Sequence, residues 1–348
     1  MLRRTFIALS ATAAIIGLPG FAAAETAFDG PTTGPKAAEG KSIVVVAGDL
    51  KNGGILGVTK GVEEAAAKIG WTVRVLDGAG SVQGRTAAIG QAVALKPDGM
   101  VINGFDAVEQ QAALSGVVAA NIPMVAWHSG PKIGCDAPGG IFANVSTDAM
   151  TVSEVAAEWA MEDGGDNVGA VIFTDSTYQI AIDKADRIKE TIEKMGGTVL
   201  EYVDTPIADT SSRMGPLTIS LLQKYGEKWT HALAINDLYF DFMGPALASA
   251  GISASDGPQA GSAGDGSEAA FQRIRSLNYQ TITVAEPLNL QGWQLVDELN
   301  RAIQGEACSG YITSPALVTQ EGLSKMGDSN LFDPDSPYRE GYAQIWGK

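Results

Sequence analysis

Residues 42–76 read SIVVVAGDLKNGGILGVTKGVEEAAAKIGWTVRVL, and this stretch contains the pattern that decides the fold. The run 42–47 is apolar and β-branched, which is typical of a strand buried on both faces. Residues 57–69 place apolar side chains three and four apart, which predicts a helix, and Gly70 ends it. A second apolar run follows at 72–76. Strand, helix and strand in this order predict a parallel βαβ unit.

The same alternation continues along the chain. We expect further strands at 99–102, 123–127, 141–145, 168–173, 198–203, 231–235, 259–263 and 281–285. Helical periodicity separates them, at 84–95, 108–120, 152–161, 180–195, 217–225, 240–250, 268–277 and 291–303. These strands are too many for one six-stranded sheet, so we predict an α/β protein with two doubly wound, Rossmann-like domains. A closed eightfold barrel is a minor alternative, because the alternation is irregular.

The first 24 residues have the features of a secretory signal peptide. Arg3 and Arg4 precede a largely apolar stretch that ends near Phe21, and 22–24 supply a small-residue cleavage pattern. The stretch is too interrupted for a transmembrane helix. The Sec and twin-arginine export routes both stay open, and no cysteine is placed to carry a lipid anchor. We expect an exported, periplasmic protein with a flexible leader at 25–41.

Composition narrows the partners. The 348 residues carry a formal net charge of -16, which disfavours nucleic acid and anionic membranes as partners.

Two cysteines, Cys135 and Cys308, favour a single disulfide in an exported chain, because neither has the close second ligand that zinc sites use. Tyr338, Tyr342 and Trp346 predict a tail that packs against the protein.

Polar side chains follow nearly every predicted strand. In parallel sheets these positions share one edge, where ligands bind. The candidates are Asp49, Asn52, Trp127, His128, Tyr178, Gln179, Asn236, Tyr239, Asp265 and Glu286. Carboxylates and carboxamides can hydrogen bond to neighbouring hydroxyls, and aromatic faces cover the C–H side of a sugar. The set therefore predicts a neutral polyhydroxyl ligand.

Structural roles compete with ligand binding at several positions. Asp106, followed by Glu109, has the pattern of a capping box, and Asp237 is a second candidate helix cap. Trp127 continues an apolar strand and could belong to the core. The sequence contains neither a G-x-S-x-G nucleophile elbow nor a P-loop, and we expect no cofactor and no metal. A pair of cleft carboxylates acting as a glycoside hydrolase stays open as an alternative.

Seven segments carry a resemblance to a known family. They are SIVVVAGDLKNGG (42–54), DGAGSVQGR (77–85), KPDGMVING (96–104), ANIPMVAWHS (120–129), HALAINDLYF (231–240), SAGDGS (262–267) and ITVAEPLNLQGWQLVDELNRAIQGE (282–306). In order and spacing the chain, over about 42–318, resembles a type I periplasmic binding protein of the ribose- and galactose-binding kind. The resemblance implies capture of a monosaccharide or polyol between two lobes and delivery to an ABC permease, without catalysis. It also implies a monomer, and a chemoreceptor is an alternative partner.

The resemblance also implies site residues and departures from the ribose-binding pattern. Asn52, Asn236 and Asp265 match sugar-binding positions of the family. Glu286 stands where ribose binders have glutamine, and His128-Ser129 replaces their Asp-Arg pair. Further departures are Gly54 and Ile55 in place of two stacking aromatics, and Ile182 in place of an arginine. The resemblance therefore disfavours ribose and leaves Trp127, Tyr178, Gln179 and Tyr239 as replacement contacts.

The family fold crosses between its lobes three times. The resemblance places these crossovers near Asp148, Pro287 and Ser314. The N-terminal lobe is then 42–147 plus 287–314, and the C-terminal lobe is 148–286 plus 315–348, including the tail. Both cysteines fall in the N-terminal lobe, which makes the expected disulfide local to it.

Overall fold

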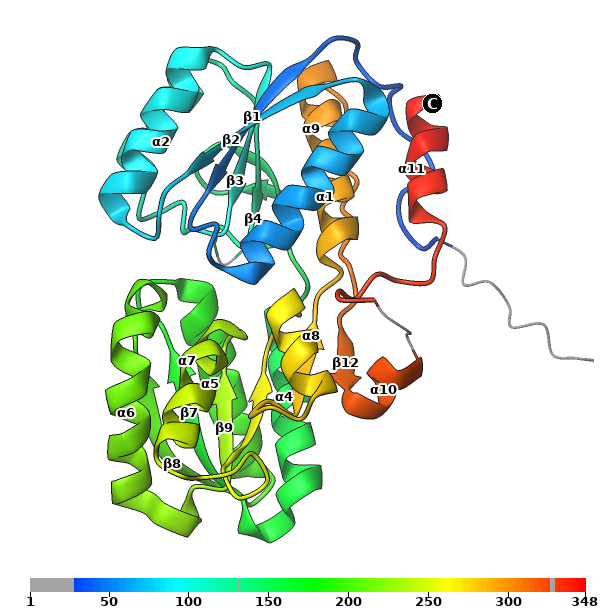
Figure 1. Cartoon of the computed structure of the whole chain (residues 1–348). Coiled ribbons are helices and arrows are strands. Elements are labelled where there is room, and N and C mark those ends of the chain that lie inside the picture. Colours follow the sequence, from blue (N-terminus) through cyan, green and yellow to red (C-terminus); the bar gives the residue numbers. More distant parts are fainter. Residues whose placement is uncertain (1–27, 131, 326–328) are drawn as a thin grey trace, which may run out of the picture.

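The computed structural model describes residues 28–130, 132–325 and 329–348, so the predicted signal peptide lies outside the described residues. The described chain forms two lobes, one above the other in Figure 1, and each is built on a six-stranded sheet. This confirms the predicted pair of doubly wound domains. Among the described residues, no helix combines the length and the apolar character needed to cross a membrane.

Lobe one contains the first sheet, with strand order β2-β1-β3-β4-β6-β5. All neighbouring strands are parallel except the β5–β6 pair. The strands are β1 (Ser42–Ala47), β2 (Thr72–Asp77), β3 (Gly99–Asn103), β4 (Met124–Trp127), β5 (Gly134–Ala137) and β6 (Ile141–Val145). Its first helices are α1 (Gly53–Ile69), α2 (Val82–Leu95) and α3 (Gln111–Ala119). Helices lie on both faces of the sheet, as doubly wound folds require.

Lobe two contains the second sheet, with order β12-β11-β10-β9-β7-β8, and only β12 is antiparallel to its neighbour. The strands are β7 (Gly169–Thr174), β8 (Thr198–Asp204), β9 (His231–Ala234), β10 (Gln259–Ser262), β11 (Ile282–Ala285) and β12 (Ala316–Thr319). Its helices are α4 (Ala149–Gly164), α5 (Gln179–Lys194), α6 (Thr210–Tyr225), α7 (Leu238–Ser249), α8 (Glu268–Arg275) and α10 (Gln320–Lys325). The sequence did not predict the edge strands β5 and β12.

Local chemistry explains how the first unit forms. The Asn52 side chain caps α1 by accepting from the backbone N–H groups of Gly54 and Ile55. Gly70, with φ of 79°, ends the helix in the left-handed conformation that glycine adopts readily. Strand β1 is buried from 43 to 47, and its apolar residues contact helices on both faces. Periodicity predicted a start at residue 57, whereas the Asn52 cap sets the start of α1 at Gly53, and both place the end of the helix at Ile69.

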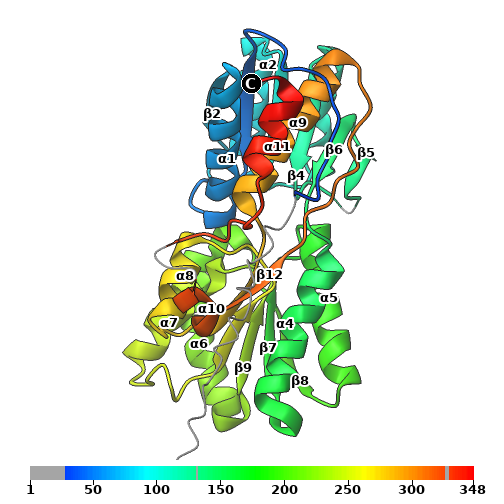
Figure 2. The ribbon, with the colours of Figure 1, turned by 90° about the vertical axis from the view of Figure 1, so that its right-hand side faces the viewer.

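The chain crosses between the lobes where β6 leads to α4, where β11 leads to α9 (Leu288–Gln304), and where α9 leads to β12. Helix α9 returns to lobe one and packs along α1. The two helices approach closely at Gly61 and Gly292: a Cβ added to Gly292 would lie 2.5 Å from the backbone carbon of Gly61. The three crossovers run between the two lobes, as Figure 2 shows from the side.

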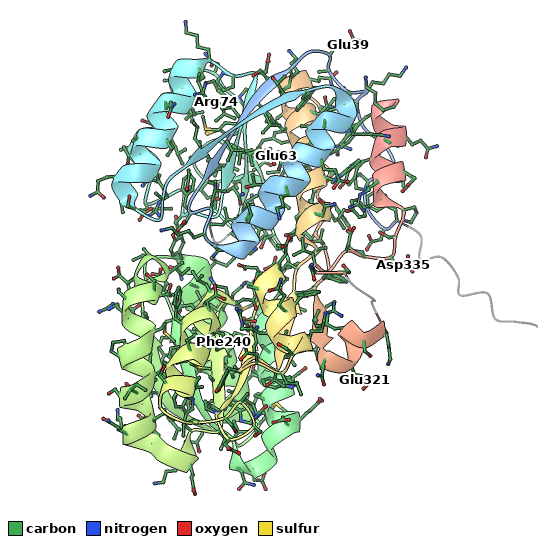
Figure 3. The ribbon with its side chains drawn as sticks, viewed as in Figure 1. Glu39, Glu63, Arg74, Phe240, Glu321 and Asp335 are labelled. Atoms are coloured by element: carbon green, nitrogen blue, oxygen red, sulfur yellow. A yellow bond between two sulfur atoms is a disulfide. The ribbon has the colours of Figure 1, made fainter. Side chains whose placement is uncertain are left out.

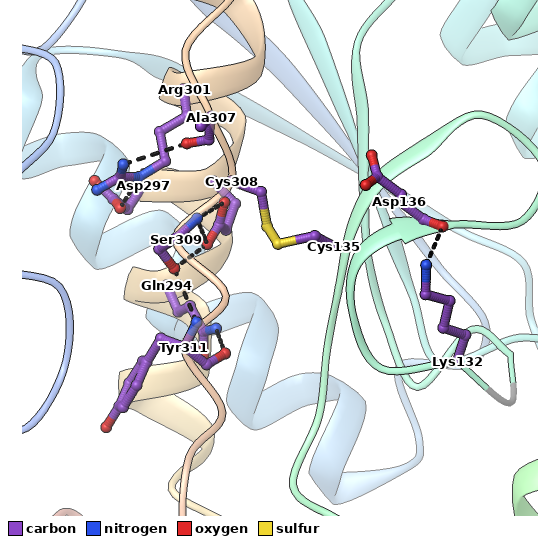
Figure 4. The surroundings of a disulfide bond; sticks show 11 residues. Lys132, Cys135, Asp136, Gln294, Asp297, Arg301, Ala307, Cys308, Ser309 and Tyr311 are labelled. Atoms are coloured by element: carbon purple, nitrogen blue, oxygen red, sulfur yellow. Dashed lines mark hydrogen bonds and ion pairs between the residues drawn. A yellow bond between two sulfur atoms is a disulfide. The ribbon is translucent and has the colours of Figure 1, made fainter.

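The predicted disulfide is present. Cys135 on β5 is bonded to Cys308, which lies after α9, and the two residues are 173 positions apart in the sequence. Both ends belong to lobe one, as the resemblance implied. Figure 4 shows the bridge between the β5 strand and the segment that leads toward the third crossover.

Two predictions about the ends of the chain are wrong. The tail was placed with the C-terminal lobe, but α11 (Tyr338–Trp346) packs on α9 and α1 of lobe one. Trp346 stacks on Trp293, with ring centroids 5.4 Å apart, and its Nε1 donates to Asp297. The burial of three aromatic side chains explains this position.

The described part of the leader, 28–41, is not free either. Asn300 on α9 accepts from the backbone of Ala38 and donates to the carbonyl of Pro35. Ala37 donates to the carbonyl of Trp346, so the leader is held between α9 and α11.

Figure 3 shows the side chains of both lobes, with Phe240 inside lobe two and Glu39, Glu63 and Arg74 on the surface of lobe one.

Candidate functional site

A cleft between the lobes brings most of the predicted residues together. Its lining from lobe one includes Asp49, Asn52, Arg85, Trp127 and His128, and its lining from lobe two includes Tyr178, Lys184, Asn236 and Asp265. Seven of the ten predicted site residues are among them. They meet because the carboxyl ends of both parallel sheets face the gap.

Three predicted residues do not line the cleft. Gln179 is exposed at the start of α5, and its side chain donates to Asp183. Tyr239 is completely buried in lobe two, where its hydroxyl donates to the carbonyl of Thr205. Glu286 is also completely buried and lies in the floor beneath the cleft.

Among the described residues, Asn52 and Asn236 each use the side-chain carbonyl oxygen within the fold and leave the amide nitrogen free for a ligand. The Asn52 carbonyl oxygen accepts from Gly54 N at 2.9 Å and Ile55 N at 3.2 Å. The Asn236 carbonyl oxygen accepts from Leu238 N at 3.1 Å. Within the described chain the amide nitrogen of each side chain makes no hydrogen bond, and both residues line the cleft. Each therefore offers a fixed donor.

Ionisable groups form the cleft floor. Nε2 of His128 lies 3.0 Å from Oε2 of Glu286, and Nζ of Lys184 lies 3.5 Å from Oε1 of the same carboxylate. Burial lowers the pKa of His128, although Glu286 opposes this effect. Burial alone would raise the pKa of Glu286, but His128 and Lys184 together hold it well below its usual range. We take Glu286 as ionised and the imidazole as neutral, because His128 is buried beside the Lys184 ammonium.

Asp265 has an opposite character. Burial, with Glu286 and Asp237 nearby, raises the pKa of Asp265 to about 8, although Lys184 opposes the shift. Its carboxyl group accepts no hydrogen bond from a described residue, and it faces the cleft. Near neutral pH it is mostly protonated and can both donate and accept a hydrogen bond.

A metal ion fits this floor poorly. One ligand atom each from His128, Asp265 and Glu286 lie within 4.8 Å of one another. The Lys184 ammonium already occupies the neighbourhood of Glu286 and donates to the carbonyl of Ala263 at 2.8 Å. A divalent cation would meet this positive charge at close range.

Trp127 is fixed in the wall of the cleft. Its ring stacks on His128 with centroids 3.7 Å apart, and its Nε1 donates to Gln291 at 2.8 Å. Only 2% of its surface is exposed, so it contributes an edge of the wall more than an open stacking platform.

The sequence prediction missed Arg85 and Lys184. Both lie on helices, within segments where apolar periodicity was the main signal. Lys184 carried a usable signal, since it falls on the buried stripe of α5 between Ala181 and Ile188. Arg85 is buried beside the cleft and forms an ion pair with Glu109 at 2.7 Å.

The two predicted helix caps are wrong. Helix α3 begins at Gln111, and the Asp106 carboxylate instead accepts from Val108 N, while Glu109 pairs with Arg85. The Asp237 side chain makes no cap bond. It accepts from the backbone N–H groups of Gly266 and Ser267, and it thereby holds the loop that carries Asp265.

Comparison with known proteins places this fold. No curated protein matched the sequence significantly. Among solved structures, a sugar ABC transporter protein from Yersinia enterocolitica subsp. enterocolitica 8081 is 17% identical with a TM-score of 0.73, and the match covers 91% of this chain and 99% of that one.

Two similar structures were solved with small molecules bound. A solute-binding protein from Agrobacterium vitis, bound with alpha-D-tagatopyranose, is 18% identical with a TM-score of 0.71, covering 84% of this chain and 97% of that one. A solute-binding protein from Mycobacterium smegmatis, with bound glycerol, is 17% identical with a TM-score of 0.71, covering 85% and 100%. At these identities the likeness shows the fold alone. The profile of the family described as periplasmic binding protein domain matches residues 43–307, and this chain therefore belongs to that family.

Proposed function

We propose that the protein is a periplasmic solute-binding receptor that captures a monosaccharide or polyol between its lobes and delivers it to an ABC permease. The observation that carries this proposal is the set of unused hydrogen-bonding groups that both lobes direct at one cleft. Asn52 offers a donor from lobe one, and Asn236, Tyr178 and Asp265 offer groups from lobe two. Burial raises the pKa of Tyr178 to about 12, so its hydroxyl stays protonated.

Charge balance supports a neutral ligand. The two cations of the lining are each paired with an acid, Arg85 with Glu109 and Lys184 with Glu286. An anionic ligand would have to disturb one of these pairs or remain unbalanced in a buried site. Hydroxyl groups, which both donate and accept, match the mixed set of free donors and acceptors.

The N-terminal sequence, the disulfide and the three crossovers support the proposed location and mechanism. The signal-like N-terminus and the Cys135–Cys308 disulfide suit an oxidising compartment outside the cytoplasm. Solved relatives of the same fold were described as ABC transporter proteins and contained tagatose or glycerol. Lobe closure about the three crossovers would remove the ligand from water, which is compatible with an affinity of about 1 μM or tighter. Binding would involve no chemical change.

A thermal-shift screen of the mature protein against monosaccharides and polyols tests the proposal. We expect at least one compound to raise the melting temperature of the wild type and to leave an Asp265→Ala variant unaffected. The exposed residue Asp166 provides the matched control, since Asp166→Ala should keep the full ligand response. A ligand response that survives Asp265→Ala would show that the binding cleft is elsewhere. Recovery of a chemically altered ligand would instead favour the hydrolase alternative.

A further inference from the structure

The C-terminal tail connects the lobes a fourth time. The family profile ends at residue 307, before β12 and α10, which belong to lobe two. Helix α11 nevertheless packs on lobe one. Figure 1 shows α10 beside the lower lobe and α11 beside the upper one. We call residues 329–337, which precede α11, the strap.

Two neighbouring residues of the strap pack into different lobes. Leu331 contacts the apolar cluster of lobe one, which includes Trp293 and Tyr338. Phe332 contacts a separate cluster of lobe two, which includes Phe271. Consecutive Cα atoms are about 3.8 Å apart, so these two side chains connect surfaces that move with different lobes.

Polar contacts hold the strap on both sides. On lobe two, Arg275 donates to the carbonyl of Ser329 at 2.8 Å. On lobe one, Asp333 accepts from the Tyr338 hydroxyl at 2.7 Å and pairs with Arg339 at 2.8 Å. Arg339 in turn pairs with Glu64 on α1. The strap is thus anchored immediately before and after the Leu331-Phe332 pair.

The strap lies beside the ligand cleft. Leu331 lines a groove between the start of α1 and the starts of α7 and α8, and Asn52 and Asp265 belong to both this groove and the cleft. Across the same groove Lys60 pairs with Glu268 at 2.9 Å. Both of those side chains are about half exposed, so their ion pair adds little to closure. Burial of Leu331 and Phe332 is the stronger link on this side.

We infer that the strap restrains opening and holds the ligand-free protein toward the closed conformation. Rotation about the three crossovers would carry the two apolar clusters apart. The neighbouring residues Leu331 and Phe332 cannot follow both, so one of the side chains must leave its contact and become exposed to water. Opening therefore costs more in this chain than in one that lacks the strap.

Small-angle X-ray scattering of the ligand-free protein tests this inference. A compact chain of this length has a radius of gyration of about 20 Å, and lobe opening enlarges it. We expect Leu331→Ala/Phe332→Ala to raise the ratio of open to closed molecules at least tenfold and to give a larger radius than the wild type. The control is Leu95→Ala, which removes an exposed leucine from α2 of lobe one and should leave the scattering unchanged.

Scattering curves that are identical for the wild type and a folded double variant would overturn the inference. If the double variant does not fold, Leu331→Ala and Phe332→Ala are measured separately, because loss of either apolar contact weakens the hold of the strap on one lobe. Unchanged curves from both folded single variants would have the same meaning. The measurement uses no ligand, so its result does not depend on the proposed sugar-binding function.

Discussion

Nε2 of His128 lies 3.0 Å from Oε2 of Glu286, so a histidine of lobe one hydrogen bonds to the first residue of the second crossover. The same oxygen accepts from Thr147 N on the first crossover at 3.4 Å and from Gln291 at 3.2 Å. Gln291 also donates to Thr313 on the third crossover. One buried carboxylate thus connects the cleft floor to all three connections between the lobes.

Glu286→Gln should weaken the fold. The substitution leaves the Lys184 ammonium, 5% exposed, without its acidic partner. Removing one member of a buried pair is costly, and we expect a loss of about 3 kcal/mol in the free energy of unfolding at pH 7. Urea denaturation at pH 7 measures this loss in the free energy of unfolding. Glu321→Gln, which breaks an exposed pair with Lys325, is the control and should have no measurable effect. Equal midpoints for both variants would contradict the role assigned to Glu286.

Asp265→Asn should stabilise the protein at pH 7.5. The unfolded chain ionises this residue near pH 4, whereas the folded protein keeps the proton up to about pH 8. Between these values the unfolded state binds fewer protons, so wild-type stability falls as the pH rises and levels off above pH 8. The variant lacks this loss.

Thermal unfolding from pH 5 to pH 8 measures the effect. Burial also raises the pKa of Glu298, to about 7, which gives a slope of the same sign in both proteins. The difference between the two pH profiles therefore isolates Asp265. We expect the variant to gain about 2 kcal/mol or more by pH 7.5 relative to pH 5. Parallel profiles would show that Asp265 ionises normally in the folded state.

The sequence predicted the fold and most of the cleft for one physical reason. In a parallel sheet the residues just after a β-branched run lie at the ligand-binding edge. Strand positions alone were therefore enough to predict Asp49, His128 and Asp265. Gln179 and Tyr239 were misplaced because side-chain direction there depends on where a helix begins, and helix starts are poorly determined by periodicity.

The residues that the sequence did not assign depend on contacts between distant segments. The tail aromatics at 338, 342 and 346 repeat every four residues and so predict a packing helix, but not the lobe that it covers. Asp237 and Asp106 had the residue types of caps, yet their partners lie in the loop at 266–267 and at Val108. Propensity identifies a polar side chain at a turn, and only the tertiary structure selects its partner.

Removing the disulfide should weaken lobe one. Cys135→Ser/Cys308→Ser releases β5 from the segment after α9, and those segments are 173 residues apart in the sequence. We expect the free energy of unfolding to fall by about 2–4 kcal/mol. Urea denaturation compares the variant with the oxidised wild type. Reductant should lower the wild type toward the variant and leave the variant itself unchanged, whereas a variant as stable as the oxidised wild type would argue against a structural role.

Gly54→Ala should keep the lobes apart. A Cβ at Gly54 would lie 2.3 Å from the Asp265 carboxylate of the opposite lobe, so the closed arrangement cannot accept it unchanged. We therefore expect a larger ligand-free radius by X-ray scattering and loss of stabilisation by any sugar or polyol that protects the wild type.

Gly90→Ala is the matched control for this substitution. Gly90 also lies within a helix of lobe one, α2, but no atom lies within 4 Å of its added Cβ. Gly90→Ala should raise the free energy of unfolding by up to about 1 kcal/mol, because alanine favours the helix interior over glycine. It should keep both the wild-type radius and the ligand response. If Gly54→Ala retained full ligand protection, the approach of α1 to the Asp265 loop would not belong to the ligand-bound state. The two glycines therefore separate the effect of alanine on a helix from its effect on lobe closure.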